Sequence, residues 1–288
     1  MKIGLTTQVV STGFEFEPLA GGDTLRYRPA QSNYAGLIFG YRWLGSTLTF
    51  AVPATDEIQA AEGKSDYADY RFSLYWKRLG IEAGYNSFKR YIIENSSALS
   101  SSTLDGQRYY ALPDFTSKGF GLNMMWALGE GSYGLDAAID QSAWQQDSGG
   151  AWLVLVSWRQ QQLKNSGPII PTEKQASFGE DGLIREASMG NYAAGGGYGY
   201  NYVSGSFFIA PLIAISGGLQ HISYLAGTEK KQSSKVTFNA HTRLSLGFNA
   251  QSYFVTVVGY IDVFAREIKS LRMNTLVQGF SFNAGLRF

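Results

Sequence analysis

The chain has 288 residues and a formal net charge of +1, which gives no reason to expect a nucleic-acid partner. The lack of cysteine excludes disulfides and thiolate metal sites, and no run of about 18 apolar residues is present to form a membrane-spanning helix. Only 16% of the residues are charged, against about 25% in a usual soluble domain. With 15% aromatic residues and 34 glycines, the composition favours a wall that faces lipid. The mean hydropathy of -0.13 agrees with a barrel, in which lumen-facing polar and lipid-facing apolar residues cancel.

The N-terminal residues Met1–Leu5 do not form an apolar signal core followed by a small-residue cleavage site. An exported protein needs such a signal. We therefore expect Met1 to be the start of a mature or re-engineered chain.

Apolar and polar residues alternate with a period of two along much of the chain, which predicts β-strands. The apolar positions of the clearest segment are Val236, Phe238, Ala240, Thr242, Leu244, Leu246 and Phe248, and the interleaved residues are polar or small. Similar alternation runs through 2–12, 33–43, 45–53, 67–77, 80–93, 117–128, 133–145, 151–162, 190–203, 206–220, 252–266 and 279–288, although Leu153 and Leu155 blur the polar side of their segment. Strands of about ten residues have the length that a tilted strand needs to cross the hydrocarbon.

These segments number about 13, whereas bacterial single-chain barrels close with an even number of strands. A further strand at Gln107–Leu112, turning at Pro113-Asp114, restores an even number and keeps short and long connections on opposite sides. We therefore predict one domain over residues 1–288, an all-β, transmembrane, antiparallel, up-and-down β-barrel of about 14 strands, with 12 as the alternative. A soluble β-sandwich would also alternate, but it would not explain strands this long or the aromatic residues near strand ends.

The connections predict the orientation of the barrel. The short turns Leu79-Gly80, Ser204-Gly205 and Asn249–Ser252 should be periplasmic, together with both termini. The longer stretches are expected to be extracellular loops and lie at 14–31, 94–104, 163–189, 224–234 and 267–275.

Several different short motifs are spread along the chain, at Tyr27-Arg28-Pro29, Gly40–Gly45 with the strand ending at Pro53, Gly63-Lys64, Tyr75–Gly80, Tyr85–Tyr91, Gln146–Trp152, Asn165–Pro171 and Phe207–Pro211. Together they resemble an uncharacterised family of outer-membrane barrels, common in Bacteroidota and known only as a domain of unknown function. At Phe88-Lys89-Arg90 the chain departs from the family pattern, in which a glycine follows the lysine. The resemblance implies the fold and a bacterial outer-membrane location, but no chemistry. The apolar alternation up to Phe288 is also similar to the signal that the barrel-insertion machinery reads.

Charged and polar side chains on the face opposite the apolar one are expected to line the lumen. They are Arg42, Asp69, Arg71, Glu82, Arg90, Asp136, Asp140, Arg159, His241, Arg243, Asp262, Arg266 and Arg287. Because an unpaired charge in a narrow lumen is costly, opposite charges should pair across it. Mixed signs favour a salt-bridged interior over a selectivity lining for one kind of ion.

No catalytic residue, metal-ligand set or cofactor is predicted. His221-Ile222-Ser223 is similar to the His-x-Ser pairing of outer-membrane lipid A deacylases, in which the imidazole is the base for the hydroxyl. Those enzymes have Asn where Tyr224 stands here, and a polar strand end near the outer rim is the favoured interpretation. His241 should be a hydrogen-bonded lumen residue. Gly195-Gly196-Gly197 lies in an alternating segment without a following helix, so it predicts tight curvature or the close approach of a plug, not a phosphate loop.

The function predicted is that of a non-enzymatic outer-membrane protein. A narrow channel for small solutes, with a polar and charge-paired lumen, is the first hypothesis, because the 163–189 loop could constrict it. A non-conducting structural or accessory subunit of an outer-membrane complex is the alternative, and a lipid-modifying enzyme is a distant third. The expected partners are membrane lipid and lipopolysaccharide, the insertion machinery during assembly and other outer-membrane proteins.

Overall fold

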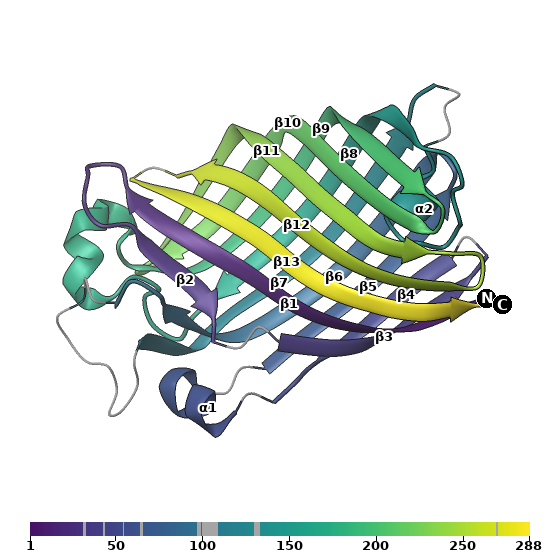
Figure 1. The fold of residues 1–288 in the computed structure, drawn as a ribbon. Helices are drawn as coiled ribbons and strands as arrows, with labels where there is room; N and C mark the ends of the chain where they lie inside the picture. Colours follow the sequence, from purple (N-terminus) through teal and green to yellow (C-terminus); the bar gives the residue numbers. More distant parts are fainter. Residues whose placement is uncertain are drawn as a thin grey trace.

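The computed structural model describes residues 1–30, 33–42, 44–53, 55–63, 66–96, 99, 109–129, 133–268 and 270–288. Within these residues the chain forms thirteen antiparallel strands, arranged as a tall tilted barrel (Figure 1). The strands are β1 (Lys2–Pro18), β2 (Leu25–Pro29), β3 (Asn33–Tyr41), β4 (Leu44–Ala51), β5 (Asp66–Trp76), β6 (Leu79–Ile93), β7 (Tyr110–Ala127), β8 (Gly149–Lys164), β9 (Ile184–Ser204), β10 (Phe207–Ala226), β11 (Glu229–Asn249), β12 (Tyr253–Glu267) and β13 (Leu271–Arg287). The helical segments are α1 (Asp56–Glu62), α2 (Leu135–Ala138) and the 3-10 segment η2 (Thr172–Asp181).

The first and last strands close the barrel. β1 pairs with β13 along its whole length, from Lys2 opposite Arg287 to Pro18 opposite Leu271. The two chain ends meet at one rim, where the Met1 amino group donates a 2.7 Å hydrogen bond to the Phe288 carbonyl oxygen. The predicted closed, antiparallel, up-and-down barrel is therefore confirmed.

The wall divides on the other side of β1. Its first half, Lys2–Val9, pairs with β3, whereas Phe14–Phe16 pairs with β2. β2 in turn pairs with the end of β6, so it bypasses β3, β4 and β5. Near the termini, the ring contains each of the thirteen described strands except β2. At the opposite end, the ring is narrower, because it contains β2 but lacks β3, β4 and β5.

A bulge in β6 makes this change of partner possible. The register of β6 against β7 shifts between Lys89 and Tyr91, and the intervening Arg90 has a φ of 72°. Residues up to Lys89 pair with β5, and those from Tyr91 pair with β2. A positive φ favours glycine, which is the residue that the resemblance led us to expect after Lys89.

Side chains alternate between the two faces of the wall as the sequence predicts. Phe238 on the outer face is 74% exposed, whereas Asn239 on the inner face is 4% exposed. On β11 the outward apolar band extends from Val236 to Phe248. At about 3.4 Å per residue and a tilt of about 40°, this band is about 30 Å tall, which is the thickness of a hydrocarbon core. Among the described residues, every helix is too short or too polar to cross a bilayer.

Two strand assignments of the sequence prediction are wrong. The segment 133–145 is not a strand, because it contains α2 and the coil that follows. Tyr110–Leu112 begins β7, which continues through Pro113-Asp114 without a turn, while Gln107 lies outside the described residues. The strand number is thus thirteen within the described residues instead of fourteen, with the five-residue β2 as an additional member.

Three of the predicted loops are mostly strand, and the first of them, 14–31, includes the end of β1 and the whole of β2. β10 and β11 are joined by the tight turn Gly227-Thr228, where 224–234 was expected to be a loop, and 267–275 is mostly strand as well. These strand ends extend beyond the apolar band, so their outer faces are polar and have the composition of loops. The turn between β5 and β6 is Lys77-Arg78, just before the predicted Leu79-Gly80.

Glycines on β9 allow the neighbouring strand to approach closely. A Cβ on Gly195 would overlap the backbone carbonyl oxygen of Ile215 on β10, and one on Gly197 would overlap that of Ile213. The sequence predicts tight curvature or close approach of a plug at these glycines, whereas the close approach in the structure is that of the neighbouring strand β10.

We expect Gly195→Val to destabilise the barrel by about 3 kcal/mol or more, because the added atoms overlap backbone that has no room to move. The yield of folded, heat-modifiable protein on electrophoresis measures this. Gly259→Val is the matched control, because nothing lies within 4 Å of a Cβ there. Equal folded yields for the two variants would contradict the prediction.

Candidate functional site in the barrel lumen

An ion pair crosses the lumen between β11 and β6. The Arg243 guanidinium donates from Nη1 to Oε1 of Glu82 over 3.1 Å, and the Tyr75 hydroxyl also donates to this carboxylate. β6 and β11 lie on opposite sides of the ring of strands. The pair therefore spans the interior and connects opposite walls.

A second set of contacts crosses from β8 to β12. Arg159 Nη2 lies 3.2 Å from Oδ2 of Asp262, and His241 Nδ1 lies 3.0 Å from the other oxygen of that carboxylate. The Arg159 guanidinium also lies 4.3 Å from the centre of the Phe264 ring. His241 thus lies in the lumen and contacts Asp262.

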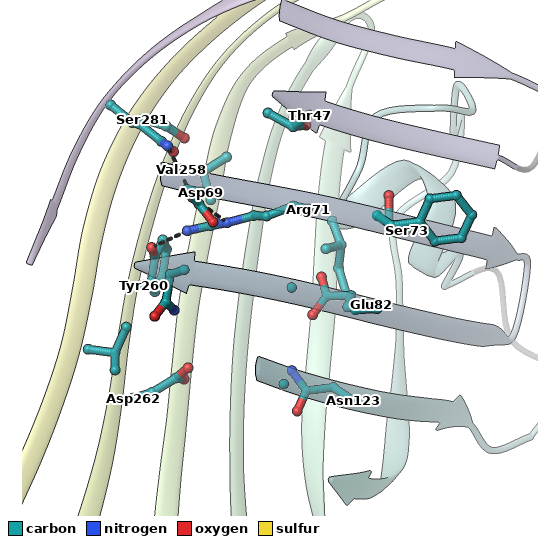
Figure 2. Close-up of a pocket in the computed structure, with 18 of the residues that line it drawn as sticks. Thr47, Asp69, Arg71, Ser73, Glu82, Asn123, Val258, Tyr260, Asp262 and Ser281 are labelled. Atoms are coloured by element: carbon teal, nitrogen blue, oxygen red, sulfur yellow. Dashed lines mark hydrogen bonds and ion pairs between the residues drawn. The ribbon is translucent and has the colours of Figure 1, made fainter. Parts of the chain in front are cut away.

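A third set joins β5 to β12 (Figure 2). Arg71 donates from Nε to Asp69 over 3.0 Å on its own strand, and from Nη2 to the Tyr260 hydroxyl over 2.8 Å across the lumen. Asp69 is 4% exposed and also accepts a 3.4 Å hydrogen bond from Gln8. In all three sets, each arginine is paired with one carboxylate, so the acids and bases at mid-height balance.

A polar cavity of about 270 Å³ surrounds these contacts. Its lining includes the three arginines and three carboxylates, together with amides such as Asn86 and Asn123. Within the described residues, the side-chain oxygens of these two amides have no hydrogen-bond partner in the protein. The cavity is therefore suited to water or a small polar solute, and its balanced charges select for neither sign of ion.

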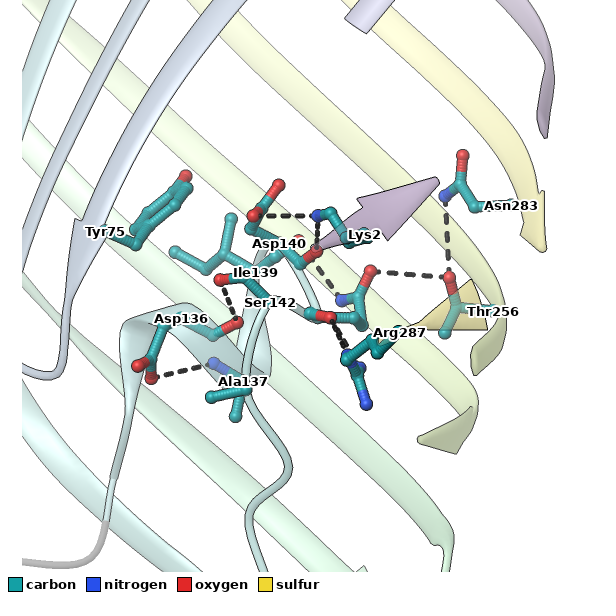
Figure 3. A network of polar contacts seen from close by, with 12 residues as sticks. Lys2, Tyr75, Asp136, Ala137, Ile139, Asp140, Ser142, Thr256, Asn283 and Arg287 are labelled. Atoms are coloured by element: carbon teal, nitrogen blue, oxygen red, sulfur yellow. Dashed lines mark hydrogen bonds and ion pairs between the residues drawn. The ribbon is translucent and has the colours of Figure 1, made fainter. Parts of the chain in front are cut away.

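Residues 133–147, between β7 and β8, enter the lumen at the end near the termini (Figures 1 and 3). Leu135, Ala137 and Ala138 of α2 are buried, and Leu135 packs with the inward-facing Leu153 and Leu155 of β8. The two leucines that blur the polar side of the strand in the sequence are thus the apolar lining against which this segment packs. We call residues 133–147 the plug.

Polar contacts from both terminal strands hold the plug. Lys2 Nζ donates to the Asp140 carboxylate over 2.9 Å and to the Asp140 carbonyl oxygen over 2.7 Å. Arg287 donates to the carbonyl oxygen of Gln141 and to the side chain of Asn249. The plug is therefore attached to the seam where β1 meets β13.

The narrower end of the barrel is filled by aromatic side chains and by the connection between β8 and β9. Phe14, Tyr91 and Phe115 form a contact group with centroid distances of 4.7–6.1 Å. Residues 165–183, which we call the cap, lie over this group, and the Tyr27 hydroxyl donates to the Ile169 carbonyl oxygen over 3.0 Å. The lumen is thus filled at both ends.

Asp181 fastens the cap to the barrel. It is fully buried and accepts hydrogen bonds from Tyr224 over 3.0 Å and from the Ser270 hydroxyl over 2.6 Å and backbone N–H over 2.9 Å. Burial raises the pKa of Asp181, but these hydrogen bonds and the nearby Lys231 outweigh it, so its pKa is below the usual value.

The structure places the predicted lumen residue Arg42 outside the lumen, and it places two others on the plug inside it. Arg42 is exposed in the turn between β3 and β4, with its guanidinium 5.5 Å from the Tyr41 ring centre, so it does not line the lumen. Asp136 and Asp140 belong to the plug and not to a strand, because this segment enters the lumen from its rim. The side chain of Arg266 lies outside the described residues.

His221 contacts a serine on the neighbouring strand, not the Ser223 of the His-x-Ser pattern. His221 faces outward, and its Nδ1 lies 2.9 Å from Oγ of Ser234 on β11. Among the described residues, no group of three or more His, Cys, Asp or Glu side chains could hold a metal ion. Sequence reasoning predicted that opposite charges pair across the lumen, but not which residues pair. It missed the plug, for which the signal in the sequence is the apolar pair Leu153 and Leu155.

A closed barrel with an outer apolar band of hydrocarbon height and a polar interior is a transmembrane β-barrel of the outer-membrane type. The chain belongs to the family described as Domain of unknown function (DUF4421), whose model matches residues 1–288.

The chain is similar in structure to several solved outer-membrane proteins. OmpT of Vibrio cholerae is 8% identical, with 100% of this chain and 97% of that chain covered and a TM-score of 0.37. Ail, the attachment invasion locus protein of Yersinia pestis, is 11% identical, with 72% and 98% covered and a TM-score of 0.33. The Pseudomonas putida toluene transporter TodX is 8% identical, with 100% and 90% covered and a TM-score of 0.30. No curated protein matches the chain by sequence.

We expect Arg243→Ala to destabilise the barrel by about 3–5 kcal/mol, because it leaves Glu82 without its counter-charge in a narrow lumen. The midpoint of urea unfolding measures the effect. A second variant, Glu82→Gln combined with Arg243→Ala, removes both charges and should recover part of the loss. A wide aqueous lumen would screen Glu82 and reduce the loss of unfolding free energy to about 0–1 kcal/mol. An unchanged midpoint for Arg243→Ala would therefore contradict a narrow interior held by ion pairs.

We expect the cap to loosen in acid. Because the folded pKa of Asp181 is lowered, its stabilisation is complete above the ordinary aspartate pKa of about 4 and is lost as the pH falls through the folded value. Asp181→Asn should weaken the cap by about 1–3 kcal/mol at neutral pH. Protease cleavage within 165–183 measures this, with the exposed Glu180→Gln as the matched control. Equal cleavage of both variants at neutral pH would refute the role of Asp181.

Proposed function

We propose that the protein is an outer-membrane barrel that does not conduct at rest and acts at its surfaces as a structural or accessory component of the envelope. The observation that carries this proposal is the set of ion pairs and hydrogen bonds that cross the lumen at mid-height, from Arg243, Arg159 and Arg71. Each one occupies cross-section that a diffusing solute would need. The proposal assigns no chemistry and no cofactor to the lumen.

The two ends of the barrel support the same proposal. The plug packs apolar side chains against the wall near the termini, and the cap covers an aromatic group at the far end. A solute would have to displace both segments and separate the charge pairs. Apolar side chains such as Phe238 and Phe282 on the outer face would contact lipid, and the barrel-insertion machinery and lipopolysaccharide remain proposed partners.

A narrow channel for small solutes is the second candidate, favoured by the polar cavity of about 270 Å³. This function requires the plug to move. Its contacts to Lys2 and Arg287 are polar and can exchange with water, so a plug that leaves the lumen is chemically reasonable.

Conductance across planar bilayers distinguishes the two candidates. We expect no stepwise current from the wild-type protein, and none from a variant in which residues 133–147 are replaced by a short Gly/Ser linker, because the cap and the cross-lumen pairs remain. Stepwise current from the variant alone would favour the gated channel. A steady ohmic current from the wild type would overturn the proposal of a closed barrel.

A further inference from the structure

The outer face of strands β8–β11 carries three successive rows of side chains that the strand register defines. The lowest row is Trp158, Tyr192, Leu219 and Val236, all exposed and apolar or aromatic. The next row is Gln160, Gly190, His221 and Ser234. The third is Gln162, Ser188, Ser223 and Gln232. The apolar band therefore ends between the first row and the second.

The second row lies at the depth of the lipid ester bonds. Two residues of a strand tilted by about 40° rise about 5 Å, so His221 is about 5 Å above the edge of the apolar band. The interfacial layer on each side of the hydrocarbon is about 5–7 Å thick, and it contains the ester groups of acyl lipids. These residues lie toward the rim opposite the termini, which is the outer side in barrels whose ends are periplasmic.

Within this row a histidine and a serine have the geometry of a base and a nucleophile. His221 Nδ1 lies 2.9 Å from Oγ of Ser234, and both residues are exposed on the outer face. When the imidazole carries its proton on Nε2, its Nδ1 accepts a hydrogen bond from the serine hydroxyl. Next to His221 on β9 is Gly190, which has no side chain of its own, and the Gln160 side chain from β8 lies beside it, with Oε1 3.2 Å from the position that a Cβ would take.

We propose that Ser234 and His221 form an outward-facing catalytic pair that cleaves acyl esters of outer-leaflet lipids. This inference goes beyond the closed barrel of the proposed function and does not depend on whether the lumen conducts. Acyl esters occur in both glycerophospholipids and lipopolysaccharide, and the bond cleaved is the same in each.

The reaction balances with water as the only co-reactant. Ser234 Oγ attacks the ester carbonyl carbon while its proton passes to His221 Nδ1. The bond from that carbon to the alcohol oxygen breaks, and the departing alcohol takes the proton from the imidazole. Water then gives a proton to His221 and adds to the acyl-serine carbon. The fatty acid leaves, and Ser234 recovers its proton.

Labelling with a fluorophosphonate probe tests the nucleophile in the full-length folded barrel, with the modified residue located by mass spectrometry. We expect the probe on Ser234, and a rate lower by about a hundredfold in His221→Ala, because a general base contributes a factor of this order. Ser223→Ala is the matched control: Ser223 shares the outward face of β10 but lies one row further from the apolar band. It should label like the wild type.

The substrate arms use mixed micelles of phosphatidylethanolamine or of rough lipopolysaccharide, with released fatty acid as the readout. Release from either substrate that disappears in Ser234→Ala supports the proposal and identifies the source of the ester. Because Ser234 and His221 are exposed on the surface, heat-modifiability should confirm that all variants fold. No labelling of the folded wild type, labelling that is unchanged in His221→Ala, or labelling on Ser223 would each overturn the proposal.

Discussion

The pairing of charges across the lumen is the constraint on which the interior depends. Arginine and carboxylate side chains inside a narrow barrel lose most of their hydration, and an unpaired one costs several kcal/mol. Glu82 and Arg243 lie on opposite walls, so they satisfy each other only if those walls stay close. The same holds for Arg159 and Asp262. The polar residues therefore keep the barrel narrow instead of lining a wide pore.

The division of the wall at β2 explains why the interior is aromatic at one end of the barrel and charged in the wider part. Where β2 bypasses β3, β4 and β5, the ring has fewer strands and its lumen is narrower. Aromatic side chains such as Phe14, Tyr91 and Phe115 reach one another there and fill the space without water. In the wider part the walls are too far apart for such packing, and long charged side chains and the inserted plug occupy the interior.

The strands were predictable because each carries its own signal. Alternation in 236–249 or 67–77 needs no knowledge of neighbouring strands, and the structure has both segments as strands with the predicted faces. The plug was not predictable in this way, because a segment that enters the lumen is covered on all sides and loses the two-sided pattern. β2 has only five residues, too few for a period to be evident.

For the predicted lumen residues, too, the sequence gives the direction of a side chain but not its partner. Asp69, Arg71 and Arg243 follow from alternation alone, since the strand face determines where each side chain points. Their partners do not follow: Arg243 and Glu82 are 161 residues apart, and only the completed ring brings them together. The outward pair of His221 and Ser234 was missed for a similar reason. His-x-Ser is a pattern within one strand, whereas the observed contact joins neighbouring strands. Because β10 and β11 are hydrogen-bonded from Phe207 opposite Phe248 to Ala226 opposite Glu229, that contact has the fixed register of a sheet, and groups held on regular strands are positioned more accurately than groups on loops.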